Sequence, residues 1–156
     1  RLEKMLHVGD KAPLFIGKYY SNKESFRLED FIGKDVVIVD FWYTHCHPCV
    51  KAMPSLNKLY LKYKDKGLTV FGLNSVDNQP RSIGNLNRFL GKRDIDYDII
   101  LTKPEVDIMY KISGYPTMYV VDKDGKIAYA EIGFNEEGFD ILIEKVESLL
   151  GKNRIK

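Results

Sequence analysis

The sequence has few cysteines and no long apolar run, and each shortage excludes a class of protein. Only two of the 156 residues are cysteines, at positions 46 and 49. A secreted scaffold held together by disulfides would need more cysteines at wider spacing. The longest unbroken apolar runs are about four residues, as at 36–39, whereas about 20 are needed to cross a bilayer. We therefore expect no segment of this sequence to span a membrane.

An excess of charge of either sign is also missing. The chain has 24 lysines and arginines against 22 acidic residues, and the two kinds are interspersed. Without a basic stripe there is no electrostatic case for nucleic-acid binding, so we expect no nucleic-acid partner. Apolar residues make up 44% and charged residues 29% of the chain, which is typical of a globular protein rather than a disordered one.

No repeat, low-complexity tract or Gly/Ser-rich linker divides the chain. Its length suits one ordinary domain. We therefore predict a single domain over 1–156, in which residues 1–8 are a lead-in or linker. The sequence begins with Arg1, as a processed mature protein or a domain excised from a longer exported protein would, and both alternatives stay open.

Alternating strand and helix patterns predict an α/β fold. The continuous apolar, β-branched run at 35–42 is typical of a strand buried on both faces. The helical pattern at 47–64 contains Pro54, which should kink that helix. The alternation that follows implies a parallel central sheet, to which a late hairpin adds an antiparallel edge. The expected elements are a hairpin over 14–28, strands over 35–42, 68–73, 97–101, 117–121 and 126–131, and helices over 47–64, 80–91, 104–110 and 136–150.

Both cysteines lie where the buried strand passes into the first long helix, in the segment His45-Cys46-His47-Pro48-Cys49. A thiol at a helix N-terminus is close to the positive end of the helix dipole, which favours the thiolate. The thiolate is the nucleophile in disulfide exchange. We therefore predict Cys46 as the exposed attacking sulfur and Cys49, one turn later, as the resolving sulfur. A protonated imidazole at His45 or His47 would favour the thiolate further.

This junction resembles the active site of thioredoxin-fold proteins, in the order of the surrounding motifs as well as in its cysteines. Asp40 stands six residues before Cys46, where thioredoxins have a buried acid, and Pro54 stands at the proline within the same helix. Gly114-Tyr115-Pro116-Thr117 is similar to the loop whose proline is cis and faces the cysteines. The resemblance covers roughly residues 35–150. It implies a thioredoxin fold, with a central mixed β-sheet flanked by helices.

Two further features resemble the extracytoplasmic TlpA/ResA-type branch of thiol–disulfide oxidoreductases. The opening at 8–13 with its hairpin is similar to the N-terminal extension of that branch, and the interval 77–114 has room for an inserted helix and strand. The resemblance implies a periplasmic or otherwise extracytoplasmic protein, often with a membrane tether that lies outside this chain. It also implies a reductase role, for instance in cytochrome c maturation, that needs no organic cofactor.

The resemblance assigns roles to individual residues. Asp40 would take the proton from Cys49, and burial among apolar neighbours should raise the pKa of its carboxyl. The backbone of Tyr115 and Pro116 would hold an extended substrate segment by strand-like hydrogen bonds. Trp42 would pack in the core beside the site and also contact substrate, and His47 would tune the reduction potential.

The chain departs from the family pattern at two positions. Thioredoxins pair the buried acid with a lysine on the next strand, where this chain has Gly72. The TlpA/ResA-type branch commonly has a glutamate three residues after the second cysteine, where this chain has Ala52. The departures leave the reduction potential and the direction of electron flow open.

The predicted function is therefore a thiol–disulfide oxidoreductase, foremost a disulfide reductase that acts on protein or peptide disulfides and depends on an upstream electron donor or acceptor protein. An oxidase or isomerase with the same residues is the alternative within this chemistry. A copper- or zinc-binding metallochaperone is the alternative from another class, because His45, Cys46, His47 and Cys49 offer imidazole and thiolate ligands. Ligands that straddle the start of a helix are awkward for one tetrahedral ion, so we predict no metal ligand.

Overall fold

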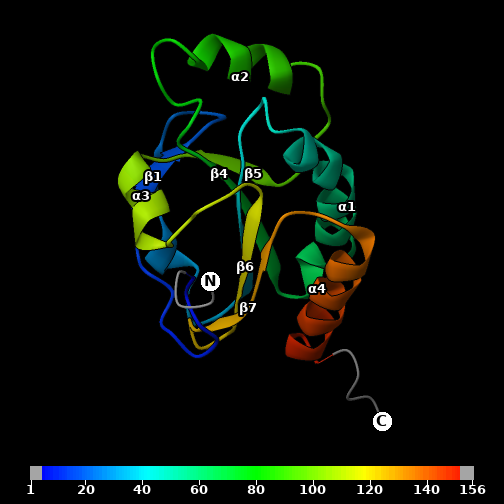
Figure 1. Ribbon diagram of the computed structural model, residues 1–156. Coiled ribbons are helices and arrows are strands. Elements are labelled where there is room, and N and C mark those ends of the chain that lie inside the picture. Colours follow the sequence, from blue (N-terminus) through cyan, green and yellow to red (C-terminus); the bar gives the residue numbers. More distant parts are fainter. Residues whose placement is uncertain (1–4, 152–156) are drawn as a thin grey trace.

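The computed structural model describes residues 5–151, and these form seven strands and four α-helices (Figure 1). The strands are β1 (Ile16–Tyr19), β2 (Ser25–Arg27), β3 (Val36–Phe41), β4 (Leu68–Asn74), β5 (Asp98–Leu101), β6 (Thr117–Val121) and β7 (Ile127–Ile132). The helices are α1 (His47–Tyr63), α2 (Ile83–Leu90), α3 (Pro104–Met109) and α4 (Glu136–Leu149). The predicted α/β class is confirmed.

The strands form one mixed sheet in the order β2-β1-β5-β4-β3-β6-β7. Its middle, β5-β4-β3, is parallel, as the alternation of strands and helices predicted. The hairpin of β6 and β7 adds an antiparallel edge beside β3, also as predicted. The N-terminal hairpin adds a second antiparallel edge, because β1 pairs with β5. That pairing was not predicted.

Strand β3 is buried along its whole length, as its unbroken apolar run predicted. Successive side chains of a strand point to opposite faces of the sheet. Val36 and Ile38 accordingly belong to one core cluster, and Val37 and Val39 belong to a second cluster on the other face. Asp40 has the same parity as Val36 and Ile38, so its carboxyl group enters the first cluster.

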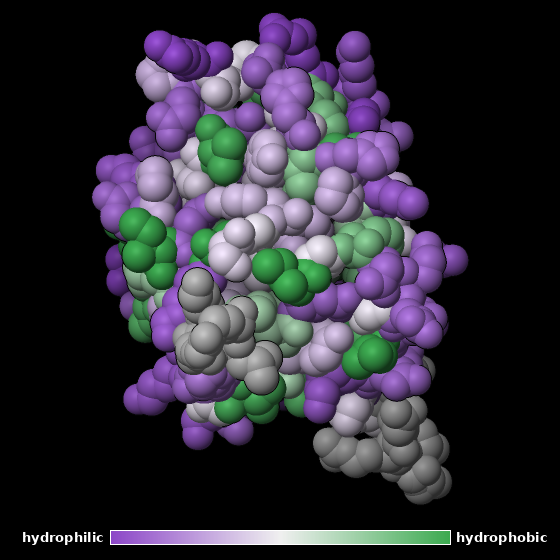
Figure 2. Space-filling view, in the orientation of Figure 1, coloured by the Kyte–Doolittle hydropathy of each residue, from purple (hydrophilic) through white to green (hydrophobic). Residues whose placement is uncertain are grey.

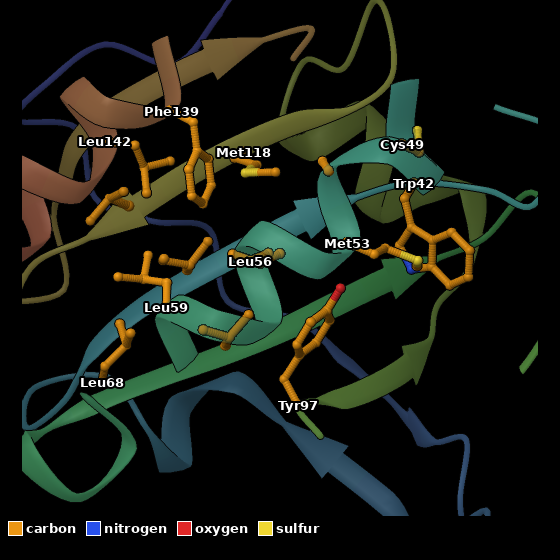
Figure 3. Close-up of a cluster of buried hydrophobic side chains, with 14 of the residues drawn as sticks. Trp42, Cys49, Met53, Leu56, Leu59, Leu68, Tyr97, Met118, Phe139 and Leu142 are labelled. Atoms are coloured by element: carbon orange, nitrogen blue, oxygen red, sulfur yellow. The ribbon is translucent and has the colours of Figure 1, made fainter. Parts of the chain in front are cut away.

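The helices divide between the two faces of the sheet. Side chains of α1, α2 and α4 complete the first cluster, and Leu56 and Leu59 of α1 and Leu142 of α4 lie together in Figure 3. Val106 of α3 and Phe26 of the N-terminal hairpin belong to the second cluster. Figure 1 shows α2 lying across the end of the sheet at which α1 begins. The start of α1 is therefore the place where the sheet and two helices meet.

The N-terminal segment is in contact with the fold from the first residues that the structure describes. Met5 and Leu6 pack against the second cluster, and the Leu6 N–H donates to the Tyr119 hydroxyl at 3.2 Å. The rest of the expected lead-in, residues 1–4, lies outside the described residues. Within 5–151, no helix has both the length and the apolar character needed to cross a bilayer. The single-domain organisation stays a prediction.

Candidate active site

The two cysteines form a disulfide at the first turn of α1. Their Cα atoms are 5.2 Å apart, and Cys46 is the N-cap residue, whose Sγ accepts the Cys49 N–H at 3.3 Å. Cys49 is completely buried, whereas Cys46 keeps 5% of its surface exposed. Cys46 is thus the less deeply buried of the two sulfurs, but it is not the exposed sulfur that the sequence predicted. Its role as the attacking sulfur stays a prediction.

Asp40 is buried on strand β3, and among the described residues its carboxyl group has no hydrogen-bond partner to stabilise a charge. It is 1% exposed, and in the described part of the chain neither carboxylate oxygen has a hydrogen-bond partner. Desolvation raises the pKa of Asp40 to about 7, because a buried carboxylate loses its hydration. The carboxyl can therefore take up or release a proton near neutral pH, as proton transfer to or from a thiol requires.

The partner that thioredoxins give this acid is replaced here by aromatic rings. Asp40 is paired in register with Gly72 of β4. A Cβ atom at Gly72 would lie 2.9 Å from Ile99 Cδ1, 3.0 Å from Trp42 Nε1 and 3.2 Å from Tyr97 Cε1. The two rings and the Ile99 side chain occupy the space that a lysine side chain would need, which explains why a glycine fits at this position.

Tyr97 also lies near Asp40, and the sequence did not predict it as a site residue. In Figure 3 its hydroxyl points toward α1, between the labelled Trp42 and Leu56. Burial and, second, the nearby charge of Asp40 raise the pKa of Tyr97 well above its usual value. The Tyr97 hydroxyl and Trp42 Nε1 are, like Asp40, buried without a hydrogen-bond partner among the described residues. No sequence motif marked Tyr97, because it lies 57 positions from Asp40 and only folding joins them.

Trp42 lies entirely in the core. It is 0% exposed, and its ring lies 5.6 Å from that of Phe89 on α2. The expected core packing is therefore present, but in this structure the indole has no surface open to a substrate. The contact joins α2 to the strand that leads to the disulfide.

The loop at 114–117 contacts the segment before Cys46 through two tyrosines. The Tyr115–Pro116 peptide bond is cis, as the resemblance implied. The Tyr115 ring packs edge-on against Tyr43, with centroids 5.3 Å apart, and the carbonyl oxygen of Tyr43 accepts the Cys46 N–H at 3.3 Å. The Tyr115 hydroxyl donates to the Asp107 carboxylate. Tyr115 is thereby held beside the disulfide, with part of its surface exposed.

The segment before the disulfide is fixed by a residue that sequence analysis missed. The buried carboxylate of Asp77 accepts the Thr44 N–H at 2.8 Å and the Thr44 hydroxyl at 3.1 Å. Asp77 is itself held by Asn74, whose side chain accepts the Asp77 N–H at 2.8 Å. The available signal was Asn74 and Asp77, three positions apart at the end of a strand, because such side chains bond nearby backbone groups. The Asp77 carboxylate fixes the backbone two residues before Cys46.

The two histidines beside Cys46, His45 and His47, are both exposed. The metallochaperone alternative would require such side chains to gather into a coordination site. Among residues 5–151, no group of three or more His, Cys, Asp or Glu side chains is placed to hold a metal ion.

Comparisons with known proteins agree with this geometry. A family model described as Redoxin matches residues 7–150. The thiol-disulfide oxidoreductase ResA of Bacillus thuringiensis subsp. konkukian is 35% identical over 126 residues, which are 80% of this chain and 69% of the relative. The thioredoxin-like protein YneN of Bacillus subtilis is 34% identical over 128 residues, which are 82% of this chain and 73% of that protein.

A solved structure is similar over nearly the whole chain. It is the crystal structure of a candidate thiol:disulfide interchange protein DsbE from Chlorobium tepidum, with a TM-score of 0.84 and 29% sequence identity. The match covers 94% of this chain and 99% of that one.

Proposed function

Because this chain belongs to the Redoxin family, we propose a direction for its chemistry: it reduces disulfides of exported proteins. The resemblance to thioredoxin-fold proteins of the TlpA/ResA type is confirmed by the relatives and the solved structure. The chain is a thiol–disulfide oxidoreductase, and its substrates are protein thiols and disulfides. The direction of electron flow, the residue roles and the cellular site are the proposal.

The reaction consists of two exchanges. In the reduced protein, the Cys46 thiolate attacks one sulfur of the partner's disulfide, forming a mixed disulfide and expelling the other sulfur as a thiolate. Asp40 takes the proton of Cys49, and the resulting thiolate attacks Cys46 Sγ. The partner's remaining sulfur leaves as a thiolate, and the Cys46–Cys49 disulfide forms. Two electrons have passed to the partner, and an upstream donor protein returns two to the disulfide.

The observation that carries the reducing direction is the unpartnered, buried Asp40 on the face of the sheet covered by α1. An ionised carboxylate in a medium of low dielectric constant opposes a thiolate nearby. It thereby destabilises the reduced, charged form of the pair relative to the neutral disulfide, and a pair that favours its disulfide is a stronger reductant. Protonated His45 or His47 would act oppositely, but both are exposed, where solvent and salt weaken such effects.

The reduction potential of the Cys46–Cys49 pair tests the direction. We expect a value near that of thioredoxin, roughly −270 mV, in equilibrium with dithiothreitol or glutathione couples. A value near the oxidising extreme, roughly −120 mV, would contradict the reductase proposal and favour the oxidase or isomerase alternative. A failure to exchange two electrons at all would contradict the oxidoreductase chemistry itself.

The roles of the two cysteines are tested by trapping. Cys49→Ser leaves the attacking sulfur but removes the resolving one, so we expect it to accumulate a mixed disulfide with a partner. Cys46→Ser is the matched control and should accumulate none. Mass spectrometry of non-reduced adducts distinguishes the two, and equal trapping by both variants would contradict the assignment.

We place the reaction outside the cytoplasm, with a membrane tether outside this chain. The resemblance to the TlpA/ResA-type branch implies this location and a narrower role in cytochrome c maturation, and the ResA relative supports that resemblance. Cell fractionation of the full-length protein tests the first point. The yield of c-type cytochrome in a strain lacking the protein tests the second.

A further inference from the structure

A groove runs between α1 and α2 beside the disulfide. It consists of two adjoining hollows, of about 500 Å³ and about 620 Å³, which share Val50, Lys92 and Arg93 in their linings. The first hollow includes the segment on either side of Cys46, and the second continues past Pro54 along α1. A partner whose cysteine is joined to Cys46 must place its flanking chain within reach of this groove.

Basic side chains line the hollow beside the disulfide. The five basic residues come from both walls of the groove and are His45, His47, Arg88, Lys92 and Arg93. None of the described residues that line this hollow is acidic. Asp94 is the acidic lining residue of the second hollow. The chain as a whole has a formal charge of only +2, so this gathering is local. Figure 2 shows the surface over α2, at the top of the view, as mostly hydrophilic.

Arg88, Lys92 and Arg93 form no ion pair within the part of the chain that the structure describes. Arg88 donates to the side-chain oxygen of Asn85 at 2.6 Å, and the guanidinium of Arg93 lies 4.0 Å from the centroid of the Phe89 ring. Both contacts leave the positive charge without a carboxylate. Cations gathered without counter-charges attract an anionic ligand.

The wall that carries the cations is held in place next to the active site. Phe89 of α2 packs on Trp42, which stands four positions before Cys46. Asn87 accepts the Tyr20 hydroxyl at 2.7 Å, which joins α2 to the N-terminal hairpin. Arg88 is therefore presented at a fixed place on α2. Lys92 and Arg93 follow the end of the helix, and the contact of Arg93 with the Phe89 ring joins that segment to it.

We propose that this groove binds an acidic segment that flanks the redox-active cysteines of the partner protein. The proposal rests on the proposed function, since it identifies the partner by charge. An extended segment rich in Asp or Glu would lie between α1 and α2 while the partner's sulfur is bonded to Cys46. Attraction between the groove and that segment would speed the encounter, and salt would reduce the effect.

The test uses three synthetic peptides that share one internal disulfide and carry acidic, neutral or basic flanks. Stopped-flow measurements give the rate constant for reduction of each by the reduced protein. At low ionic strength we expect the acidic peptide to react at least about 10-fold faster than the basic one. In about 1 M salt, where the Debye length is near 3 Å, the ratio should approach one.

Two double variants with the same change in net charge test whether the preference for the acidic peptide arises in the groove. Arg88→Gln with Lys92→Gln alters the groove, whereas Lys62→Gln with Lys66→Gln alters exposed lysines near the opposite end of α1. Each rate is divided by the rate at which dithiothreitol, a small neutral dithiol, reduces the Cys46–Cys49 disulfide of the same variant in its oxidised form. We expect the groove variant to lose most of the preference for the acidic peptide and the control variant to keep it.

The outcomes separate the inference from the proposed function. Normal exchange with dithiothreitol but equal rates for all peptides would overturn the acidic-partner inference and leave the disulfide chemistry intact. Equal loss of preference in both variants would show an effect of net charge, and would also overturn it. Absence of exchange with dithiothreitol would instead contradict the oxidoreductase function.

Discussion

At the scale of the residue, the chemistry of this protein depends on a carboxyl group that folding deprives of partners. Asp40 lies on a fully buried strand, and its position in the register is opposite Gly72. The side chains of Trp42, Tyr97 and Ile99 fill the space beside that glycine. The carboxyl is therefore governed by desolvation rather than by an ion pair, which is the condition under which its proton exchanges near neutral pH.

The raised pKa of Asp40 predicts a pH-dependent stability. The pKa rises from 3.8 to about 7 on folding, so between these values the folded chain holds a proton that the unfolded chain has lost. Stability therefore falls as pH rises through this window. Asp40→Asn removes the titration, so from pH 4 to pH 8 the variant should gain on the order of 4 kcal/mol relative to the parent.

Urea unfolding of both oxidised proteins at several pH values measures this difference. Asp65→Asn removes an exposed carboxylate and serves as the matched control, which should keep the parent's pH profile. A constant difference between Asp40→Asn and the parent from pH 4 to pH 8 would mean that the carboxyl does not titrate in this range.

How far single residues could be predicted depends on how local their signals are. Cys46, Cys49 and Asp40 belong to one strand–helix junction, whose pattern is continuous in the chain, and their positions followed from it. Tyr97 enters the site only through the pairing of β4 with β5. Core packing of Trp42 was expected, but its contact with Phe89 of α2 was not, because the docking of α2 leaves no sequence signal near position 42.

At the scale of the element, the sequence predicts a helix boundary well where a capping side chain marks it and less well where a turn precedes the helix. Helix α4 begins at Glu136 as expected, because Asn135 is extended and its side chain accepts the Gly138 N–H at 2.7 Å. Helix α2 begins at Ile83 instead of position 80. Residues 79–82 form a turn there, in which the Ser82 N–H donates to the Gln79 carbonyl at 3.0 Å.

The cap of α4 gives a prediction for stability. Asn135→Ala leaves an N-terminal N–H of the helix without its partner, so the free energy of unfolding should fall by about 1 kcal/mol, within a usual range of about 0.5–2 kcal/mol. Asn135→Asp keeps the acceptor and places a negative charge at the positive end of the helix, so it should restore the loss. Chemical denaturation with the disulfide intact measures both.

A substitution within the same helix controls for helix propensity. Glu144 is exposed on α4, and Glu144→Ala should change stability by less than about 0.5 kcal/mol. A comparable loss at Glu144 and Asn135 would show that the cap contributes nothing specific.

At the scale of the whole molecule, the N-terminal hairpin is the part whose relation to the rest was hardest to predict. Its strands were evident from the sequence, but an isolated hairpin pattern does not name the sheet edge that it joins. In the structure, Phe26 of β2 is 1% exposed, and its ring lies 4.8 Å from Phe71 of the central strand β4. Further rings surround it, those of Phe15, Tyr19 and Phe31. The hairpin thus shares a core with the strands beside the active site.

This shared core predicts that the hairpin and the redox site unfold together. Phe26→Ala should lower the free energy of unfolding by about 3–5 kcal/mol, as removal of a buried aromatic ring does. Trp42, the one tryptophan of the chain, reports on the opposite face of the sheet, and far-ultraviolet circular dichroism reports on all elements. If 1–156 is one domain, both signals change at the same denaturant concentration in the parent. In the variant they again change together, at a lower concentration.

Ile16→Ala, on the same hairpin but 65% exposed, should move neither signal appreciably. An early circular dichroism transition that leaves the Trp42 fluorescence unchanged would instead mean that the hairpin is a separate folding unit, and the single-domain prediction would be wrong.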